Sequence, residues 1–165
     1  MMTAEELARE LAHPGAQQLL SGAMARLAYN GPDGFPRVVP VGFHWNGKRI
    51  VVSTAPTSPK ARALAVRPEV ALTIDTGSTP EEAKALLVRG VAILDTVEGV
   101  SDEYLESARN SLDDAAFTEF ERNVRATYPQ MVRISIEPRW ARFFDFGAGR
   151  LPAFLADLVG GGDGS

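Results

Sequence analysis

The chain of 165 residues contains no cysteine and only two histidines. The absence of cysteine excludes disulfides, thiolate metal sites and a cysteine nucleophile, and it favours an intracellular, cytoplasmic location. Neither His13 nor His44 has a second histidine or a carboxylate at metal-site spacing, so we expect no bound metal. We interpret His13 as a helix-capping residue before Pro14, and His44 as a structural hydrogen-bonding residue.

Several other patterns are missing. No run of apolar residues approaches the ~18 of a membrane span, and the N-terminus lacks the apolar core of a signal peptide. The net charge of −4 argues against a broad basic surface for nucleic acid. Neither G-x-S-x-G nor G-x-G-x-x-G occurs, so a serine-hydrolase elbow and a Rossmann nucleotide site are unsupported. We therefore expect no membrane or nucleic-acid partner and no catalytic triad.

The residues that are present predict a mainly β domain over residues 1–159, with a disordered glycine-rich tail at 160–165. The sequence predicts six strands, at 23–29, 35–45, 49–54, 70–75, 84–97 and 130–146. Strands at such short intervals favour a closed or nearly closed antiparallel barrel. Helical patterns flank it in the N-terminal segment 1–22, in an insertion at 101–126 before the last strand, and at 150–159.

Turn-forming residues locate the strand ends. Asn46-Gly47 lies between two β-branched segments and predicts a hairpin with a primed turn, which needs positive φ angles. Gly90 lies in the middle of a long strand and predicts a bulge or a sharp bend. Pro138 predicts an interruption of the last strand, and Thr3 with Glu6 predicts a capping box at the first helix.

A short helix over 58–67 carries two cations in its first turn. Ser58 is a suitable N-cap and Pro59 a suitable first residue, since its missing N–H would have no partner there. Lys60 and Arg62 then lie at the positive end of the helix dipole, which is unfavourable unless an anion such as phosphate lies between them. The alternative, two solvated surface cations beside an ordinary cap, stays open on these residues alone.

Four motifs in order resemble one family. G-F-P-x-V-x-P-V is followed by G-x-x-I-x-x-S-T, K-x-R-x-L and R-P-x-V-A-L-x-I-D. Together they resemble the pyridoxamine 5′-phosphate oxidase-like split-barrel flavoproteins, over roughly residues 24–146. Within that family the sequence looks similar to the small actinobacterial branch that binds FMN or the deazaflavin coenzyme F-420. The resemblance therefore implies a six-stranded antiparallel split β-barrel with flanking helices.

The resemblance also implies a site and an activity. The expected function is an FMN- or deazaflavin-dependent oxidoreductase that passes hydride to a small organic acceptor, with FMN preferred because no further basic cluster lies near 58–67. The alternatives are a non-catalytic flavin-binding protein or, less in keeping with FGAGRLPAF near the C-terminus and no histidine after Trp45, a pyridoxamine 5′-phosphate oxidase. The expected cofactor-binding residues are Val39, Pro40 and Val41 along the ring, and Ser53, Thr54, Lys60 and Arg62 at the phosphate.

The family forms its flavin site at a two-fold interface, so a homodimer is expected. Trp140, Phe143 and Phe144 alternate across the last strand, which suggests a core on one face and a dimer contact on the other, to which Trp140 and Phe144 would contribute. Stacking on a substrate is the alternative role for these aromatic residues. Arg139 and Arg142 could then reach a cofactor in the partner. Surface exposure is the alternative for both cations.

Overall fold

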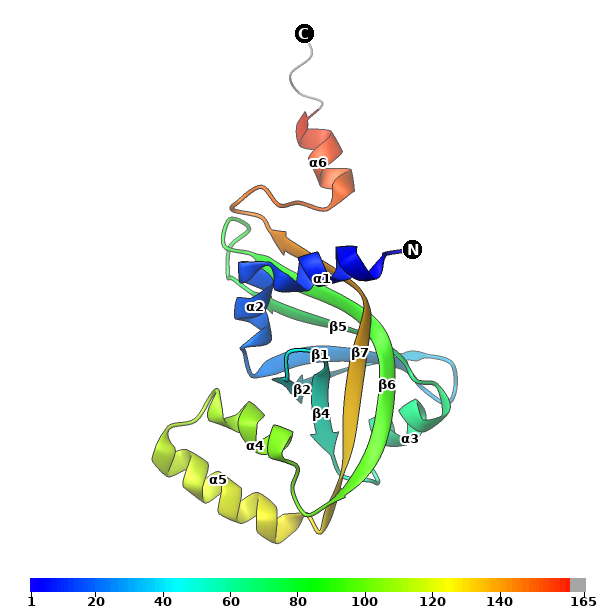
Figure 1. The fold of residues 1–165 in the computed structure, drawn as a ribbon, viewed down its shortest axis with the longest axis vertical. Helices are drawn as coiled ribbons and strands as arrows, with labels where there is room; N and C mark the ends of the chain where they lie inside the picture. The colour runs from blue at the N-terminus through cyan, green and yellow to red at the C-terminus, as the bar shows by residue number, and fades with distance from the viewer. Residues whose placement is uncertain (161–165) are drawn as a thin grey trace.

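The structure, a computed structural model, describes residues 1–160. It contains one antiparallel sheet with strand order β2-β1-β5-β6-β7-β4-β3 (Figure 1). The strands are β1 Met24–Asn30, β2 Pro36–Gly42, β3 His44–Trp45, β4 Ile50–Thr54, β5 Glu69–Thr76, β6 Lys84–Glu98 and β7 Gln130–Asp145. The predicted mainly β antiparallel architecture is confirmed, with seven strands instead of six.

The additional strand arises because the predicted strand 35–45 is broken at Phe43. β2 pairs with β1, whereas β3 pairs with β4 on the opposite edge of the sheet. Phe43 between them is fully buried, and its N–H donates to the carbonyl of Ala23 at 3.1 Å. The two edge strands, β2 and β3, are thus consecutive in the chain, and the sheet curls into a barrel that stays split between β2 and the opposite edge formed by β4 and the short β3.

The hairpin turn differs from the primed turn that the sequence predicts. Among residues 1–160 only glycines have positive φ, and Gly47 is one of them at 92°. Asn46 keeps a negative φ and accepts hydrogen bonds through its side-chain oxygen from the N–H groups of Lys48 and Arg49, at 2.9 and 2.7 Å. The prediction of positive φ at Asn46 is wrong because its carboxamide satisfies the turn instead.

β6 and β7 are long strands of 15 and 16 residues. They pair with each other along their whole length, with a bulge between Arg89 and Gly90. A Cβ on Gly90 would lie 2.4 Å from the Glu137 carbonyl oxygen, so only glycine allows this approach. The predicted bulge is confirmed. The predicted interruption at Pro138 is wrong, because Pro138 lies opposite Gly90 at the bulge, where a missing N–H is tolerated.

Six helices flank the sheet: α1 Ala4–Ala12, α2 Pro14–Leu20, α3 Pro59–Val66, α4 Asp102–Arg109, α5 Asp114–Thr127 and α6 Ala153–Gly160. The capping box of α1 is formed, with Glu6 N–H donating to Thr3 Oγ1 at 3.1 Å and Thr3 N–H donating to Glu6 Oε2 at 2.7 Å. His13 caps α2 as predicted, since its Nδ1 accepts from Gly15 N–H at 3.0 Å. Gly160 is the last residue of α6, and the rest of the predicted tail lies outside the described residues.

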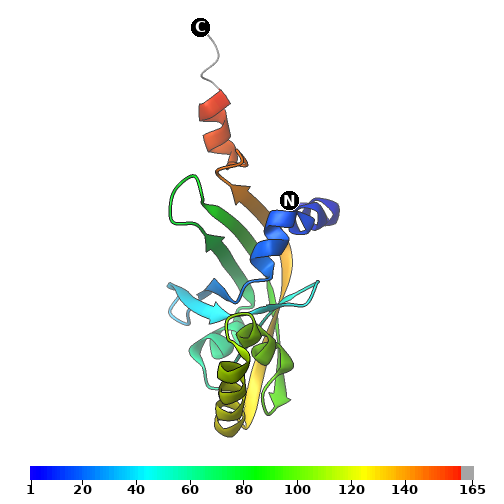
Figure 2. The same cartoon turned by 90° about the vertical axis from the view of Figure 1, so that its left-hand side faces the viewer.

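Two hydrophobic clusters stabilise the fold. The interior of the barrel is filled by Leu27, Phe43, Ile134 and Ile136, and α2 and α3 cover it from the flank. α4 and α5 form a second cluster with the ends of β6 and β7, and α6 extends away from the body in both views (Figures 1 and 2). Within residues 1–160 the longest helix, α5, has 14 residues, so no helix there is long and apolar enough to span a membrane.

Candidate functional site

The first turn of α3 carries a partly buried cation. Ser58 Oγ accepts from Ala61 N–H at 3.2 Å and Pro59 opens the helix, as the sequence predicts. Lys60 follows and is half-buried, and burial lowers the pKa of its amine. Within residues 1–160 no carboxylate lies at ion-pair distance from this amine. A partly buried cation at a helix N-terminus without a carboxylate partner is suited to an anionic ligand.

Arg62 does not share this position. Side chains two residues apart leave a helix axis about 200° apart, so Lys60 and Arg62 lie on different sides of α3. Arg62 is exposed and lines a groove of about 500 Å³ between the outer face of α3 and the loop after β1. The structure therefore does not bring the two predicted cations together on one helix face.

The two hydroxyl residues at the end of β4 have different surroundings. Ser53 Oγ lies 2.5 Å from Ser101 Oγ, and Ser101 also caps α4 by accepting from Tyr104 N–H at 3.2 Å. Thr54 is half-buried and is the last residue of β4, immediately before the loop to α3. Thr54 and Lys60 thus flank one short loop, while Ser53 is hydrogen-bonded to the helical insertion.

The three predicted ring residues lie on edge strand β2. Val41 is buried, Val39 packs partly against the core, and Pro40 is exposed on the outer face of the sheet. α4 contacts β2, β3 and β4, and a Cβ on Gly42 would meet Ser107 Oγ of α4 at 3.4 Å. The helical insertion therefore lies over the split between β2 and β4. The sequence identified the insertion as helical but did not place it there, because that packing joins segments far apart in the chain.

The middle of the outer face of the sheet combines small and apolar residues with the cations Arg26 on β1 and Arg89 on β6. Its central row runs across β2, β1, β5, β6 and β7 through Val38, Ala28, Ala71, Arg89 and Trp140. The guanidinium of Arg89 lies 4.1 Å from the ring centroid of Trp140, a cation–π contact. A hollow of about 280 Å³ lies on this row.

The alternation of aromatic residues on β7 matches the sequence prediction. Phe143 is buried in the barrel, whereas Trp140 and Phe144 are half-exposed. Arg142 lies on the same outer side as Trp140, with its guanidinium 5.7 Å from the Trp140 ring centroid, and Arg139 is exposed at the bulge. These positions are compatible with a subunit contact, which stays a prediction.

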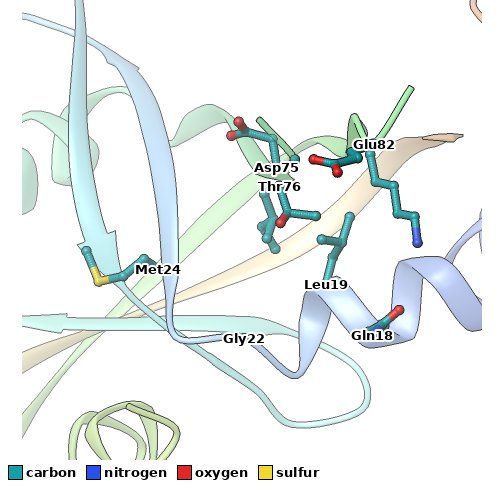
Figure 3. A pocket seen from close by; sticks show the side chains of 10 residues that line it. Gln18, Leu19, Gly22, Met24, Asp75, Thr76 and Glu82 are labelled. Carbon is teal, nitrogen blue, oxygen red and sulfur yellow. The ribbon is translucent and has the colours of Figure 1, made fainter. Parts of the chain in front are cut away.

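A further pocket of about 560 Å³ opens between α2, the start of β1 and the β5–β6 turn (Figure 3). Asp75, Glu82 and Lys84 line it, beside the apolar Leu19 and Met24. Both carboxylates already have partners: Asp75 pairs with Arg26, and Glu82 accepts from Ser78 Oγ at 3.1 Å. No predicted cofactor-binding residue lines this pocket, and no sequence motif indicated it, because its walls come from three separate segments.

Solved structures with the same fold are found at low sequence identity. A conserved hypothetical protein from Mycobacterium tuberculosis is 21% identical, and the match covers 92% of this chain and 90% of that protein's chain, with a TM-score of 0.60. An F420 reductase is 23% identical, and the match covers 76% of this chain and 94% of the reductase chain, with a TM-score of 0.52. A haem storage protein from Vibrio cholerae is 20% identical, and the match covers 82% of this chain and 96% of that protein's chain, with a TM-score of 0.58.

No curated protein matches the chain. At these identities the solved structures show a shared fold and not a shared ligand. The sequence pattern of one family, described as pyridoxamine 5′-phosphate oxidase, matches residues 16–144, which include β1 to β6, all but the last residue of β7, and the helices α3, α4 and α5. The chain therefore belongs to the pyridoxamine 5′-phosphate oxidase family.

Proposed function

We propose that this protein binds FMN, or alternatively the deazaflavin coenzyme F-420, and acts as an oxidoreductase that passes hydride to a small organic acceptor. The observation that carries this proposal is the half-buried Lys60, whose amine has a lowered pKa and no carboxylate partner within residues 1–160. A cofactor phosphate at the start of α3 would supply the missing negative charge.

The residues around Lys60 fit a phosphate in part. Lys60 and the first N–H groups of α3 would bind the phosphate oxygens, and the Thr54 hydroxyl lies across the same loop. Arg62 would contribute only if its side chain turned back across the helix. Ser53 would have to exchange its hydrogen bond with Ser101 for one to the cofactor.

The ring of the cofactor would lie along β2. Val39, Pro40 and Val41 present an apolar edge strand with few side-chain donors, so the ring would be held mainly by shape and backbone groups. When bound, the flavin or deazaflavin supplies the hydride chemistry itself. The chain would bind the cofactor, orient it and exclude water, which explains why no catalytic constellation is found in the sequence.

A homodimer belongs to the same proposal. The outer face around Ala71 and Trp140 is apolar enough to pack against a second copy, and a two-fold contact would use the same face on both subunits. Arg139 and Arg142 border this face and would then lie near the partner's cofactor. A specific interface of this kind buries more than about 1,000 Å² in total.

The choice between cofactors rests on the charge near α3. Arg67 is the one further cation of this helix region, and it donates to the Gly31 carbonyl at 3.3 Å. A longer, more anionic deazaflavin tail would want a larger basic cluster, so we favour FMN. The structural similarity to an F420 reductase supports deazaflavin as the alternative.

Two alternative functions rest on separate observations. Binding without turnover is supported by the similarity to a haem storage protein, which shows that this fold also serves proteins named for holding a ligand. Pyridoxamine 5′-phosphate oxidase activity, the activity in the family's name, is less well supported, because no histidine follows Trp45.

The test is a spectrum, a titration and a turnover assay. The purified protein is titrated separately with FMN and with deazaflavin, and then assayed with reduced nicotinamide or reduced deazaflavin and a panel of quinone-like acceptors. We expect FMN binding and turnover of at least one acceptor. Bound cofactor with no acceptor turned over would favour a binding protein, and micromolar deazaflavin binding without FMN binding would reverse the cofactor choice.

A further inference from the structure

The C-terminal helix α6 is apolar apart from Asp157, and no other element of residues 1–160 buries any of its side chains. Its sequence is AFLADLVG, and none of its residues is buried. Phe154, Leu158 and Val159 are 66%, 74% and 72% exposed. A helix with so much apolar surface is normally covered on most of its sides, because that surface is unfavourable in water. Some surface must therefore cover α6 in the working protein.

The groove beside α3 has the matching character. It is lined by Pro32, Pro59, Ala63 and Val66, with Arg62 and Arg67 contributing the positive charge. Val66 is 79% exposed, so this wall is also an uncovered apolar surface. The volume of about 500 Å³ accepts large side chains such as those of Phe154 and Leu158.

The charges of the two surfaces are complementary. α6 carries a single charged residue, Asp157, while Arg62 and Arg67 line the groove, and among residues 1–160 Arg62 forms no ion pair. A helix bound in this groove would therefore place one carboxylate beside two guanidinium groups. Apolar contact would supply the affinity, and the carboxylate would fix the orientation.

The α6 of a chain cannot reach the groove of the same chain. α3 follows Thr54, which pairs with Val132 near one end of β7, whereas α6 follows Asp145 at the other end. Val132 and Asp145 are thirteen steps apart along β7, which corresponds to about 40 Å at ~3.3 Å per residue. Figure 1 shows α6 at the top, well separated from α3, which lies beside the lower part of β6.

The base of α6 is also fixed in place. Arg150 pairs with Glu10 of α1 at 2.8 Å, donates to the Phe143 carbonyl at 2.8 Å, and forms a bridge with Asp145. Only Leu151 and Pro152 separate this anchor from α6. The anchored base directs α6 outward, so the groove that covers it must belong to another molecule.

We propose that α6 docks into the α3 groove of a second copy of this chain, with Asp157 beside Arg62 of that copy. The contact goes beyond cofactor binding and does not depend on it. It also gives Arg62 a role on the side of α3 away from Lys60. A two-fold arrangement makes the exchange reciprocal, so each copy covers the α6 of the other.

Cross-linking tests the contact directly, because the chain has no cysteine of its own. Full-length Leu158→Cys is mixed with a larger, tagged Val66→Cys, and a short bis-maleimide reagent is added. The control mixture replaces the Val66 variant with a tagged Ala126→Cys, whose position on α5 is exposed. Docking holds the thiols at positions 158 and 66 close together, so we expect the yield of cross-linked tagged–untagged product to be at least about tenfold higher than in the control mixture. Equal yields from the two mixtures would overturn the proposal.

A charge exchange provides a second test that keeps every apolar contact. Asp157→Arg and Arg62→Asp should each weaken self-association about two- to fivefold in sedimentation equilibrium, and the double variant should recover wild-type association. Recovery of wild-type self-association in the double variant would show that Asp157 and Arg62 contact each other across the interface. A double variant whose self-association is weakened by the sum of the two single changes would contradict that contact. Both tests run without cofactor, so a failure here is distinguishable from a failure of flavin binding.

Discussion

The hydroxyl groups of Ser53 and Ser101 lie 2.5 Å apart and join the end of β4 to the first turn of α4. Ser101 is 4% exposed and simultaneously caps α4 through Tyr104 N–H. A residue expected to contact the cofactor thus also holds the helical insertion over the split of the barrel. The insertion and the site are therefore linked through one pair of hydroxyls.

Replacing Ser101 should loosen this link. Ser101→Ala removes a helix cap and a buried hydrogen bond, so we expect the free energy of unfolding to fall by about 1–2 kcal/mol. Urea denaturation followed by circular dichroism measures the change. Ser111→Ala is the matched control, since its hydroxyl donates to the Ala108 carbonyl on an exposed surface. Equal stability of the two variants would show that Ser101 is not a stabilising cap.

The β6–β7 bulge should not accept a side chain at position 90. A Cβ there would lie 2.4 Å from the backbone oxygen of Glu137, which cannot move without disturbing the bulge. Gly90→Ala should therefore lower the free energy of unfolding by about 1–3 kcal/mol. Gly160→Ala is the control, because a Cβ there meets nothing within 4 Å. Urea denaturation measures the change. A denaturation midpoint of Gly90→Ala equal to that of wild type would mean that the backbone at the bulge shifts to accommodate a Cβ at little cost.

The outer sheet face should mediate dimerisation. Light scattering should give a mass twice the 17.8 kDa of the chain at micromolar concentration. Ala71→Arg adds a bulky cation at the centre of this face and should shift the protein toward monomer while leaving its circular dichroism unchanged. Ala126→Arg, on exposed α5, should have no effect. A wild-type protein that is monomeric would contradict a shared site.

The lowered pKa of Lys60 predicts a dependence of stability on pH. Burial disfavours the charged amine, so the folded protein releases this proton at a lower pH than the unfolded chain, whose ordinary value is 10.5. Between the two pKa values the unfolded state binds more protons, and the free energy of unfolding therefore rises with pH across that window.

Lys60→Met removes this contribution. The difference in free energy of unfolding between wild type and Lys60→Met should change in favour of wild type as the pH rises from about 8 to 11. Denaturation at a series of pH values measures it, and the other titrating groups cancel in the difference. Parallel curves for the two proteins would mean that Lys60 is solvated as an ordinary surface lysine.

Local chemistry made much of the fold predictable. Thr3 with Glu6, Ser58 with Pro59, and Gly90 each specify a cap or a bulge through a few neighbouring residues, and the structure confirms all three. The break at Phe43 was not predictable in this way. It depends on β2 pairing with β1 and β3 pairing with β4 on opposite edges, which is a property of the whole sheet.

The candidate site was predictable only in part, for the same reason. The sequence located α3 and its first turn, so Lys60 was identified by its place in a helix. Helix geometry separates Arg62 from Lys60, because side chains two residues apart project about 200° apart in a helix with a 3.6-residue period. The hydrogen bond between Ser53 and Ser101 joins positions 48 residues apart, and no local sequence pattern indicates it.

The central claim is that Lys60 at the start of α3 holds the cofactor phosphate. The direct measurement is a titration of wild type, Lys60→Ala, Arg62→Ala and Arg67→Ala with FMN and with deazaflavin. A charge-assisted hydrogen bond is worth roughly 1.5–3 kcal/mol, so Lys60→Ala should weaken binding by about one to two powers of ten. Arg62→Ala should weaken binding less than Lys60→Ala, because Arg62 lies on the other side of the helix.

Arg67→Ala, near the far end of α3, should leave the affinity nearly unchanged. The Lys60→Ala protein should fold normally, since removing a cation from a helix N-terminus relieves an unfavourable interaction with the helix dipole. A loss of affinity in Lys60→Ala with full affinity in Arg67→Ala is the result the account predicts. Equal cofactor affinity in wild type and Lys60→Ala would contradict it and would place the phosphate elsewhere.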